Sequence, residues 1–259
     1  MKKILSMLLV LCMALTLCSA AFAEGKSPVD GMTVAFIPKV SGNSFFEAAN
    51  DGAQKYAEKW GLTVDYIGAP TADVTTQLEL IQQAIDKGVD AICISSVDAT
   101  GLDEKLQEAQ DAGIDVSTWD SDVSPNARAL MVSQGTASVL GPMLVEMAVD
   151  SLKERGVDVE GEVKYVWHFS NPSVSDQNSW YVAGDEYIKE KYPSWVAVHD
   201  PYYSNQDPAQ SVSVGESILD AYADVDVIIC NDSTALPGQC KAAENKGLTA
   251  KDITITGFC

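Results

Sequence analysis

Short apolar runs alternate with longer amphipathic segments along this chain, and this alternation restricts the fold more than any other feature. The longer segments carry apolar residues three or four positions apart, as at Leu78, Ile81 and Ile85, which is the spacing of one helix face. Gly61 and Gly88 directly follow two of these segments, where a glycine commonly ends a helix. Strands that alternate with helices of this length predict βαβ units and a parallel sheet.

The expected strands and helices follow one another along nearly the whole chain. The strands are expected at Thr33–Pro38, Leu62–Ile67, Ala91–Ser95, Val116–Trp119, Ala129–Ser133, Val163–Phe169, Val196–His199, Val225–Cys230 and Ile253–Phe258. The helices are expected at Asn43–Trp60, Gln77–Lys87, Leu102–Ala112, Val139–Leu152, Asp176–Tyr192, Gln210–Ala223 and Ala235–Lys246. A polar stretch, Lys153–Glu162, interrupts the alternation, which then restarts. We therefore predict an N-terminal α/β lobe at 24–137 and a C-terminal α/β lobe at 138–259.

The first residues have the three parts of a secretory signal. Two lysines precede the apolar run Ile4–Leu17, and small residues lead up to Ala23. The apolar run is short for a membrane span. Residues 1–23 are therefore predicted to be a signal peptide, and the mature chain to be exported to the periplasm or the cell surface. Lipid anchoring at Cys18 is the alternative.

The chain is strongly acidic. Its formal net charge is −20, and loss of the two lysines in residues 1–23 makes it −22 (−20 minus 2). Such a surface repels other copies of itself and keeps a protein in solution, and we expect a soluble monomer. The charge argues against nucleic acid and against an anionic membrane face as partners, because both need a basic patch.

The cysteines and histidines are too few and too scattered to indicate a zinc site or a catalytic triad. Beyond the predicted signal peptide, the cysteines are Cys93, Cys230, Cys240 and Cys259. Their spacing matches no zinc site, and the only histidines are His168 and His199. We therefore expect no catalytic triad, no metal and no cofactor. Cys230 and Cys259 close two apolar strands expected to be neighbours, so a disulfide between them is one possibility and two buried thiols the other.

Two strand-to-helix junctions carry polar side chains suited to a ligand. Asp120 follows the expected strand Val116–Trp119, and Asp176 and Gln177 follow Val163–Phe169 after a short loop. In open parallel α/β sheets, ligands bind outside the carboxyl ends of the strands. An ionised carboxylate only accepts hydrogen bonds, so it suits a ligand rich in hydroxyl donors. The sequence thus predicts a cleft for a polyhydroxylated ligand between two sheets.

Several short motifs carry a family resemblance. They are Ala35-Phe36-Ile37-Pro38-Lys39, Ser44-Phe45-Phe46, Thr118-Trp119-Asp120-Ser121-Asp122, Ser133-Gln134-Gly135-Thr136, Ser175-Asp176-Gln177-Asn178 and Ala235-Leu236-Pro237. In order and separation they resemble the LsrB-type autoinducer-2-binding proteins. These belong to the periplasmic sugar-binding proteins that serve ABC importers, with rhamnose-binding proteins as relatives.

The resemblance covers nearly the whole mature chain and implies a fold. That fold is the two-lobed type I periplasmic binding protein, in which each lobe is a doubly wound parallel α/β sheet and the ligand lies between the lobes. The last expected strand, Ile253–Phe258, reaches the end of the sequence with no helix after it. Together with the resemblance, this leads us to expect that a C-terminal part, with the return crossings to the first lobe, is missing.

The resemblance also implies the residues that contact the ligand. They are Lys39, Asp120, Asp176 and Gln177, which have the family's side chains, and Asn231 and Ser233, which stand where the family has proline and alanine. Contacts at the last two positions resemble main-chain contacts. Phe45 is expected either to stack on the ligand or to pack in the core. For Asp176, a simple role as the N-cap of its helix is the alternative.

The function that the resemblance implies is an extracytoplasmic receptor that binds autoinducer-2 and delivers it to a membrane ABC permease. Rhamnose or another monosaccharide is the alternative ligand, because Asn231 and Ser233 add polar groups. Glycoside hydrolysis by Asp120 and Asp176 is a distant alternative, and otherwise no catalytic residue is expected. The sugar-sensing core of a repressor shares the fold, but it needs an N-terminal helix-turn-helix where this chain has a signal.

Overall fold

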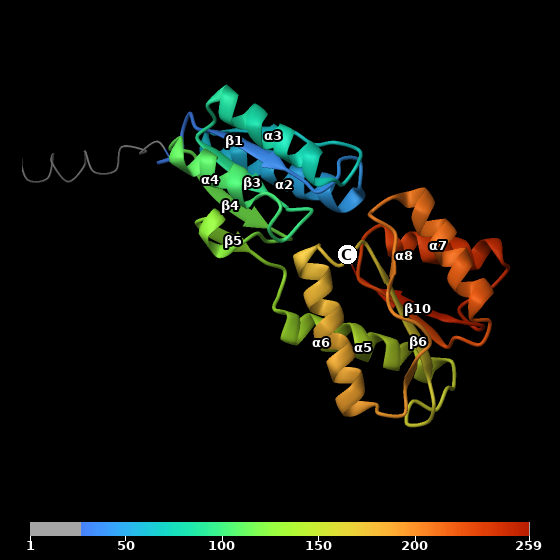
Figure 1. Ribbon diagram of the computed structural model, residues 1–259. Helices are drawn as coiled ribbons and strands as arrows, with labels where there is room; N and C mark the ends of the chain where they lie inside the picture. The colour runs from blue at the N-terminus through green and yellow to red at the C-terminus, as the bar shows by residue number, and fades with distance from the viewer. Residues whose placement is uncertain (1–26, 259) are drawn as a thin grey trace, which may run out of the picture.

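Two α/β lobes make up the molecule, and the chain passes from one to the other at residues 133–136 (Figure 1). The computed structural model describes residues 27–258. The predicted signal peptide, with Cys18, and Cys259 lie outside this range. Within it, no helix is both long and apolar enough to cross a membrane.

A five-stranded parallel sheet in the order β2-β1-β3-β4-β5 forms the first lobe. The strands are β1 (Thr33–Ile37), β2 (Thr63–Tyr66), β3 (Ala91–Ile94), β4 (Asp115–Trp119) and β5 (Leu130–Val132). The chain adds β2 on one side of β1 and then β3, β4 and β5 on the other. This reversal creates a switch point between β1 and β3, which is where α/β sheets open a ligand crevice.

Helices cover both faces of this sheet (Figure 1). Because side chains alternate along a strand, Phe36 of β1 packs with Phe46 and Trp119 on the α2 side. Its neighbours Ala35 and Ile37 join the larger cluster under α3 and α4. The first lobe's helices are α2 (Ser44–Trp60), α3 (Val74–Lys87), α4 (Asp103–Asp111) and the 3-10 turn η2 (Pro125–Ala127).

The second lobe repeats this plan. Its parallel sheet has the order β10-β9-β6-β7, and β8 also pairs with β6. Tyr165, Trp167 and Phe169 of β6 pack under α5 and α6, whereas Val166 packs under α7 and α8. The elements are α5 (Ala137–Glu154), β6 (Lys164–Phe169), α6 (Ser175–Lys191), β7 (Val196–Ala197), β8 (Tyr202–Tyr203), α7 (Pro208–Ala221), β9 (Val227–Cys230), α8 (Ala235–Asn245) and β10 (Thr254–Gly257).

Two doubly wound parallel sheets confirm the predicted fold class. The helix that follows the crossing, α5, packs against α6 and β10 and so lies with the second sheet. The boundary placed between residues 137 and 138 stays a prediction. α5 and α6 approach closely at Gly141 and Gly184, where a Cβ on Gly141 would lie 2.6 Å from the Gly184 nitrogen. Glycine there fixes the position of α6, whose first turn carries Asp176 and Gln177.

The expected strand Val196–His199 is wrong in extent. The structure has a two-residue β7 and a second short strand, β8, which the sequence prediction missed. β7 pairs with the start of β6 and β8 with its end. Pro201 lies between them, and its ring nitrogen cannot donate to a strand ladder. β7 and β8 therefore form one edge strand along β6 that is interrupted at Pro201.

Four helices, α3, α5, α6 and α7, begin earlier than predicted, and in two of them an aspartate N-cap was not recognised. α3 begins at Val74 rather than Gln77, since the Asp73 carboxylate accepts a hydrogen bond from the Thr76 nitrogen at 2.8 Å. α7 has the same kind of cap in Asp207. Aspartate is a favoured N-cap residue because it satisfies one of the free N–H groups of the first turn.

β9 and β10 are neighbours, as the possible disulfide requires. Cys230 ends β9 and is paired with Gly257 of β10. Cys230 is buried, and no two of the described cysteines, Cys93, Cys230 and Cys240, form a disulfide with each other. Because Cys259 lies outside the described residues, its bond to Cys230 stays a prediction.

Candidate ligand-binding site

Strand ends from both lobes meet at a pocket between them. It takes Lys39 from the end of β1, Asp120 from the end of β4 and Gln177 from the first turn of α6. The structure brings all the residues proposed from the sequence together here. The lining residues are Lys39, Phe45, Phe46, Asp120, Asp176, Gln177, Trp180, Gln206, Asn231, Asp232 and Ser233.

An ion cluster fills the centre of this pocket. The Lys39 ammonium lies 2.9 Å from the Asp120 carboxylate and 3.4 Å from the Asp176 carboxylate, which comes from the other lobe. Ser121 Oγ also donates to Asp176 across the lobes. All three charged side chains are buried. One lysine therefore faces two carboxylates in a region with little water.

Asp120 has an unusual backbone. Its φ is +60°, in the left-handed region, which aspartate enters at some cost in energy. The Asp120 nitrogen donates to the Val132 oxygen, and its carboxylate accepts from Ser95 Oγ at 2.6 Å and from Gln134 Nε2. Strained backbone held by its surroundings is typical of functional sites. These contacts turn the Asp120 carboxylate into the pocket.

Burial and neighbouring charges both shift the pKa values of Lys39 and Asp176. Burial by itself lowers the pKa of Lys39, but the carboxylates of Asp120 and Asp176 more than offset this, so the pKa of Lys39 is raised. For Asp176, burial raises the pKa to about 6, with Lys39 opposing and Asp120 adding to the rise. A carboxylate with this pKa is costly to keep ionised, so hydroxyl donors from a ligand would stabilise it.

Besides the Asp176 carboxylate, the second lobe contributes amide side chains to the pocket. Gln177 Oε1 accepts from the Ser170 nitrogen at 3.1 Å, and Gln177 Nε2 donates to Asp232 at 2.7 Å. Asp232 in turn accepts from the backbone nitrogens of Thr234 and Ala235, at the start of α8. Helix N-termini favour negative charge. Asp232 thereby fixes the Gln177 amide, which keeps one N–H for the pocket.

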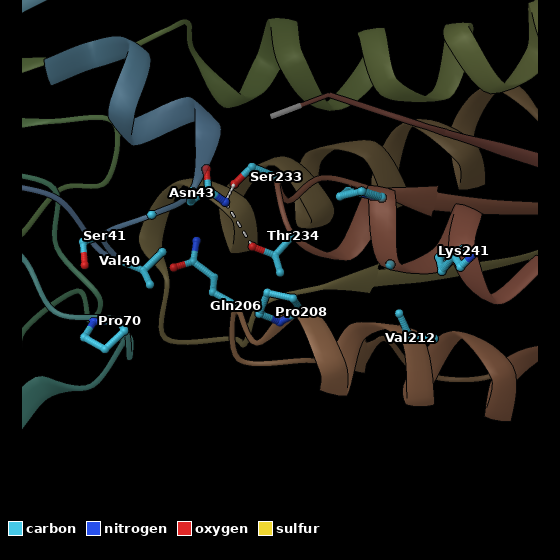
Figure 2. Close-up of a pocket in the computed structure, with 13 residues that line it drawn as sticks. Val40, Ser41, Asn43, Pro70, Gln206, Pro208, Val212, Ser233, Thr234 and Lys241 are labelled. Carbon is cyan, nitrogen blue, oxygen red and sulfur yellow. Dashed lines mark hydrogen bonds between the residues drawn. The ribbon is translucent and has the colours of Figure 1, made fainter. Parts of the chain in front are cut away.

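The side chains at the two positions that differ from the family contact protein atoms. Asn231 Nδ2 donates to the Gln177 carbonyl oxygen at 2.7 Å. Ser233 Oγ accepts from Asn43 Nδ2 at 3.1 Å, and the same amide nitrogen donates to Thr234 Oγ1 at 3.2 Å (Figure 2). Asn43 comes from the first lobe, where it is also the N-cap of α2. The Ser233 hydroxyl therefore belongs to a contact between lobes.

Aromatic rings form the apolar side of the pocket. Phe45 is half-buried, with its ring edge-on to Phe46 at a centroid distance of 5.1 Å. Its ring is also roughly parallel to Trp119 at 6.4 Å. Phe45 thus packs on the core and lines the pocket at once, so the two expectations for it are compatible. Trp180 closes another side and is buried.

Asp176 does not cap its helix. α6 begins at Ser175 with Val174 as the N-cap residue, and no side chain caps it. The N-cap alternative is therefore wrong, because Asp176 lies inside the first turn and points to Lys39 and Ser121. Ser175 makes a separate bridge between lobes, with its Oγ 2.9 Å from the Asp122 nitrogen.

Sequence reasoning missed Gln206 and Asp232 as site residues. Gln206 lies in the loop before α7 and is 4% exposed, and Asp232 is 1% exposed. The signal for Asp232 was available, since it stands between two residues that were proposed. Gln206 had only a local signal, the polar run before Pro208 that marks a turn.

A larger groove lies outside the inner pocket, between the lobes (Figure 2). The groove has a volume of about 370 Å³, against about 10 Å³ for the inner pocket. The inner volume is close to that of one water molecule. Gln206 and Ser233 line both spaces. The lobes are therefore closed over the site, and these two residues separate it from the groove.

The donor set of the inner pocket suits a polyol. Carboxylates can accept hydrogen bonds from hydroxyl groups, and the Lys39 ammonium and the Gln177 amide N–H can donate to oxygens. Within residues 27–258, no group of three or more His, Cys, Asp or Glu side chains is arranged to hold a metal ion.

Three comparisons with known proteins agree with this geometry. A family model described as a periplasmic binding protein domain matches residues 34–259. Among solved structures, LsrB from Clostridium saccharobutylicum in complex with AI-2 is 61% identical with a TM-score of 0.87, and the match covers 88% of this chain and 71% of that chain.

More distant relatives carry sugars. An ABC transporter solute-binding protein from Clostridium phytofermentas with bound L-rhamnose is 24% identical, with a TM-score of 0.80, over 87% of this chain and 68% of that one. At this identity the likeness shows the fold alone. A D-ribose/D-allose-binding protein of Pseudomonas aeruginosa is 31% identical over 110 residues, which are 39% of this chain and about a third (34%) of that protein. With its two doubly wound lobes and enclosed polar pocket, the chain belongs to the periplasmic binding proteins, and within them to the LsrB type.

Proposed function

We propose that this protein is the extracytoplasmic receptor of an ABC importer and that it binds autoinducer-2 between its lobes. The observation that carries this is the buried cluster of Lys39, Asp120 and Asp176, with Gln177 beside it. The 61% identity to LsrB in complex with AI-2 supports the choice of ligand.

Each of these groups has a role in the proposed complex. Asp120 and Asp176 accept from ligand hydroxyls, and Lys39 and Gln177 donate to ligand oxygens. Phe45 and Trp180 cover the apolar face of the ligand. Because the inner pocket holds only about 10 Å³, entry requires the lobes to part about their connection, which is the hinge motion of periplasmic binding proteins. Ligand hydroxyls then take over hydrogen bonds that Lys39 and Ser121 make in the closed molecule.

Binding without turnover follows from the same chemistry. Asp120 and Asp176 share one buried ammonium, so neither carboxylate is free to serve as the acid or base that glycoside hydrolysis requires. The family consists of periplasmic binding proteins, which supports an exported receptor that delivers its ligand to a membrane permease.

A monosaccharide is the second candidate ligand, and Asn231 is the residue that favours it. This buried side chain keeps an oxygen without a hydrogen-bond partner among the described residues. An additional ligand hydroxyl would satisfy that oxygen, and a sugar such as rhamnose has more hydroxyls to offer.

The test separates the two ligands. Complete mature protein is exposed to the medium of an autoinducer-2-producing culture, washed and denatured, and the released material is assayed for signal activity. Asp176→Ala, a good helix former inside the first turn of α6, goes through the same steps as the matched control. We expect signal from the wild type and little from the variant. Calorimetry with L-rhamnose and D-ribose runs in parallel. Micromolar sugar binding without released signal would assign the site to a monosaccharide, and the absence of both would overturn the receptor proposal.

A further inference from the structure

Gln206 lines the inner pocket but is not part of the ion cluster of Lys39, Asp120 and Asp176. It comes from the loop between β8 and α7 and is 4% exposed. Besides the inner pocket, it lines the outer groove (Figure 2). Asn205 and Gln206 have φ angles of +51° and +55°. Two successive non-glycine residues in the left-handed region cost conformational energy, so the surrounding structure must hold this loop in place.

Backbone hydrogen bonds hold the loop that carries Asn205 and Gln206 in place. The Ser204 nitrogen donates to Phe169 O, and the Asn205 nitrogen donates to Ser170 O, both at the carboxyl end of β6. The Asp207 nitrogen closes the turn on Ser204 O. The loop is thus fixed to the strand that leads to the ligand site, and the strained conformation turns Gln206 inward.

The orientation of the Gln206 amide is set by its neighbour. Nε2 lies 3.2 Å from Asp232 Oδ2. A carboxylate only accepts, so the amide nitrogen must face it and the amide oxygen must face away. That oxygen, Oε1, is buried and has no hydrogen-bond partner among the described residues. Buried polar atoms are nearly always satisfied, so one without a partner requires an explanation.

Asn231 repeats this arrangement on the same wall. Its Nδ2 donates to the Gln177 carbonyl oxygen, which fixes the amide in one orientation. Its Oδ1 is then also buried and without a partner among residues 27–258. The second lobe therefore presents two acceptors, and both lie on side chains that line the inner pocket.

We infer that Gln206 is a specificity-determining ligand contact whose amide oxygen accepts a hydrogen bond from a ligand hydroxyl on the second-lobe side, with Asn231 Oδ1 as its companion. This rests on the proposed polyol-binding function and narrows it. The ligand carries hydroxyl donors toward the second lobe as well as toward Asp120 and Asp176. A ligand with an ether oxygen or a methyl group in that position leaves the acceptors unsatisfied and binds less well.

The test compares Gln206→Met with Gln210→Met in the complete mature protein. Methionine keeps the length of glutamine but has no amide. Gln210 lies four residues further on, is exposed, and is not among the residues that line the pocket. Among the described residues, its side chain accepts only one long, exposed hydrogen bond, 3.4 Å from Asn205 Nδ2. Calorimetry measures the affinity of wild type and variants for autoinducer-2, L-rhamnose and D-ribose. For each sugar that binds, the monodeoxy derivative at each ring hydroxyl is measured as well.

We expect Gln206→Met to weaken binding of the preferred ligand about tenfold, the effect of one lost hydrogen bond to a buried group. Gln210→Met should bind as the wild type does. If the ligand is a sugar, one of its monodeoxy derivatives should bind the wild type and Gln206→Met with equal affinity. The hydroxyl missing from that derivative is the one that donates a hydrogen bond to Gln206 Oε1. The melting temperature of ligand-free protein should change little, whereas its rise on ligand addition should shrink.

Two results would overturn the inference while leaving the receptor function standing. In the first, Gln206→Met binds every ligand as the wild type does. In the second, it loses affinity equally for all derivatives and its ligand-free melting temperature falls in proportion, which shows that Gln206 only supports Asp232. If the wild type binds none of these ligands, the proposed function itself fails.

Discussion

The two walls of the pocket are built on different principles. The first-lobe wall carries Lys39 and Asp120, each held in an ion pair or by short hydrogen bonds. The second-lobe wall adds the Asp176 carboxylate to the ion cluster. Its other polar side chains are Gln177, Gln206 and Asn231, whose amides are oriented by protein atoms but keep unused hydrogen-bonding capacity. Charged groups attract ligand polar groups strongly over a wide range of directions, whereas neutral amides require a donor or acceptor in a defined direction. The comparison indicates that the charged groups, Lys39 and Asp120 with Asp176 opposite them, supply affinity and that the second-lobe amides select the ligand.

The largest effect is expected at Lys39. Lys39→Met leaves the buried carboxylates of Asp120 and Asp176 facing each other with no cation between them. Removing one partner of a buried ion pair costs about 3–5 kcal/mol of stability. Because the Lys39–Asp176 pair joins the two lobes, part of this cost falls on their closure over the ligand, and binding should weaken by about a hundredfold or more. The matched control is Lys87→Met, because Lys87 pairs with Asp65 at the surface and such pairs contribute about 0–1 kcal/mol.

Calorimetry at neutral pH measures both variants, and circular dichroism checks that they fold. An affinity for Lys39→Met within threefold of the wild type would contradict the idea that the charged groups supply most of the binding energy.

A smaller, pH-dependent effect is expected at Asp176. Its ordinary pKa of 3.8 rises to about 6 in the closed structure, chiefly through burial. Between these pH values the folded state holds more protons than the unfolded state, so the contribution of Asp176 to stability is present below pH 3.8 and is lost as the pH rises through about 6.

Thermal unfolding of ligand-free wild type and Asp176→Asn from pH 4 to pH 7 measures this. The melting temperature of the wild type should fall relative to that of the variant as the pH rises. At pH 7, Asp176→Asn should also bind ligand about tenfold more weakly, because a charge-assisted hydrogen bond contributes roughly 1.5–3 kcal/mol. A difference in melting temperature that does not change with pH would show that Asp176 is not the titrating group.

The architecture was readable from the sequence because it depends on local periodicity. Strand-length apolar runs and glycines such as Gly61 and Gly88, which end α2 and α3 with positive φ, act within a few residues of chain. Among the element ends that were wrong, three depended on single side chains: the Asp73 and Asp207 caps, and Pro201 between β7 and β8.

The site was readable only where its residues follow strands directly. Asp120 and Asp176 stand at such junctions, and the motifs around them carried the family resemblance. Gln206 lies in a loop between a two-residue strand and a helix, and its inward orientation depends on contacts with β6, some 35 residues earlier in the chain. A local sequence pattern cannot predict a contact between residues so far apart in the chain. The sequence likewise gave no indication that the Ser233 hydroxyl would meet Asn43 of the other lobe.

The smallest effect is expected at Ser233, and it tests whether a second-lobe side chain can differ from the family without selecting the ligand. Ser233→Ala restores the family's residue and removes one acceptor from Asn43, but Asn43 still donates to Thr234. Since Asn43 comes from the first lobe and Ser233 is only half-buried, water can replace the lost bond. We expect less than a threefold loss of affinity, the same for every ligand, and faster dissociation in stopped-flow measurements, because one bond that holds the lobes closed is gone. A change in the order of ligand preference would instead place the Ser233 hydroxyl on the ligand and extend the selecting wall beyond Gln206 and Asn231.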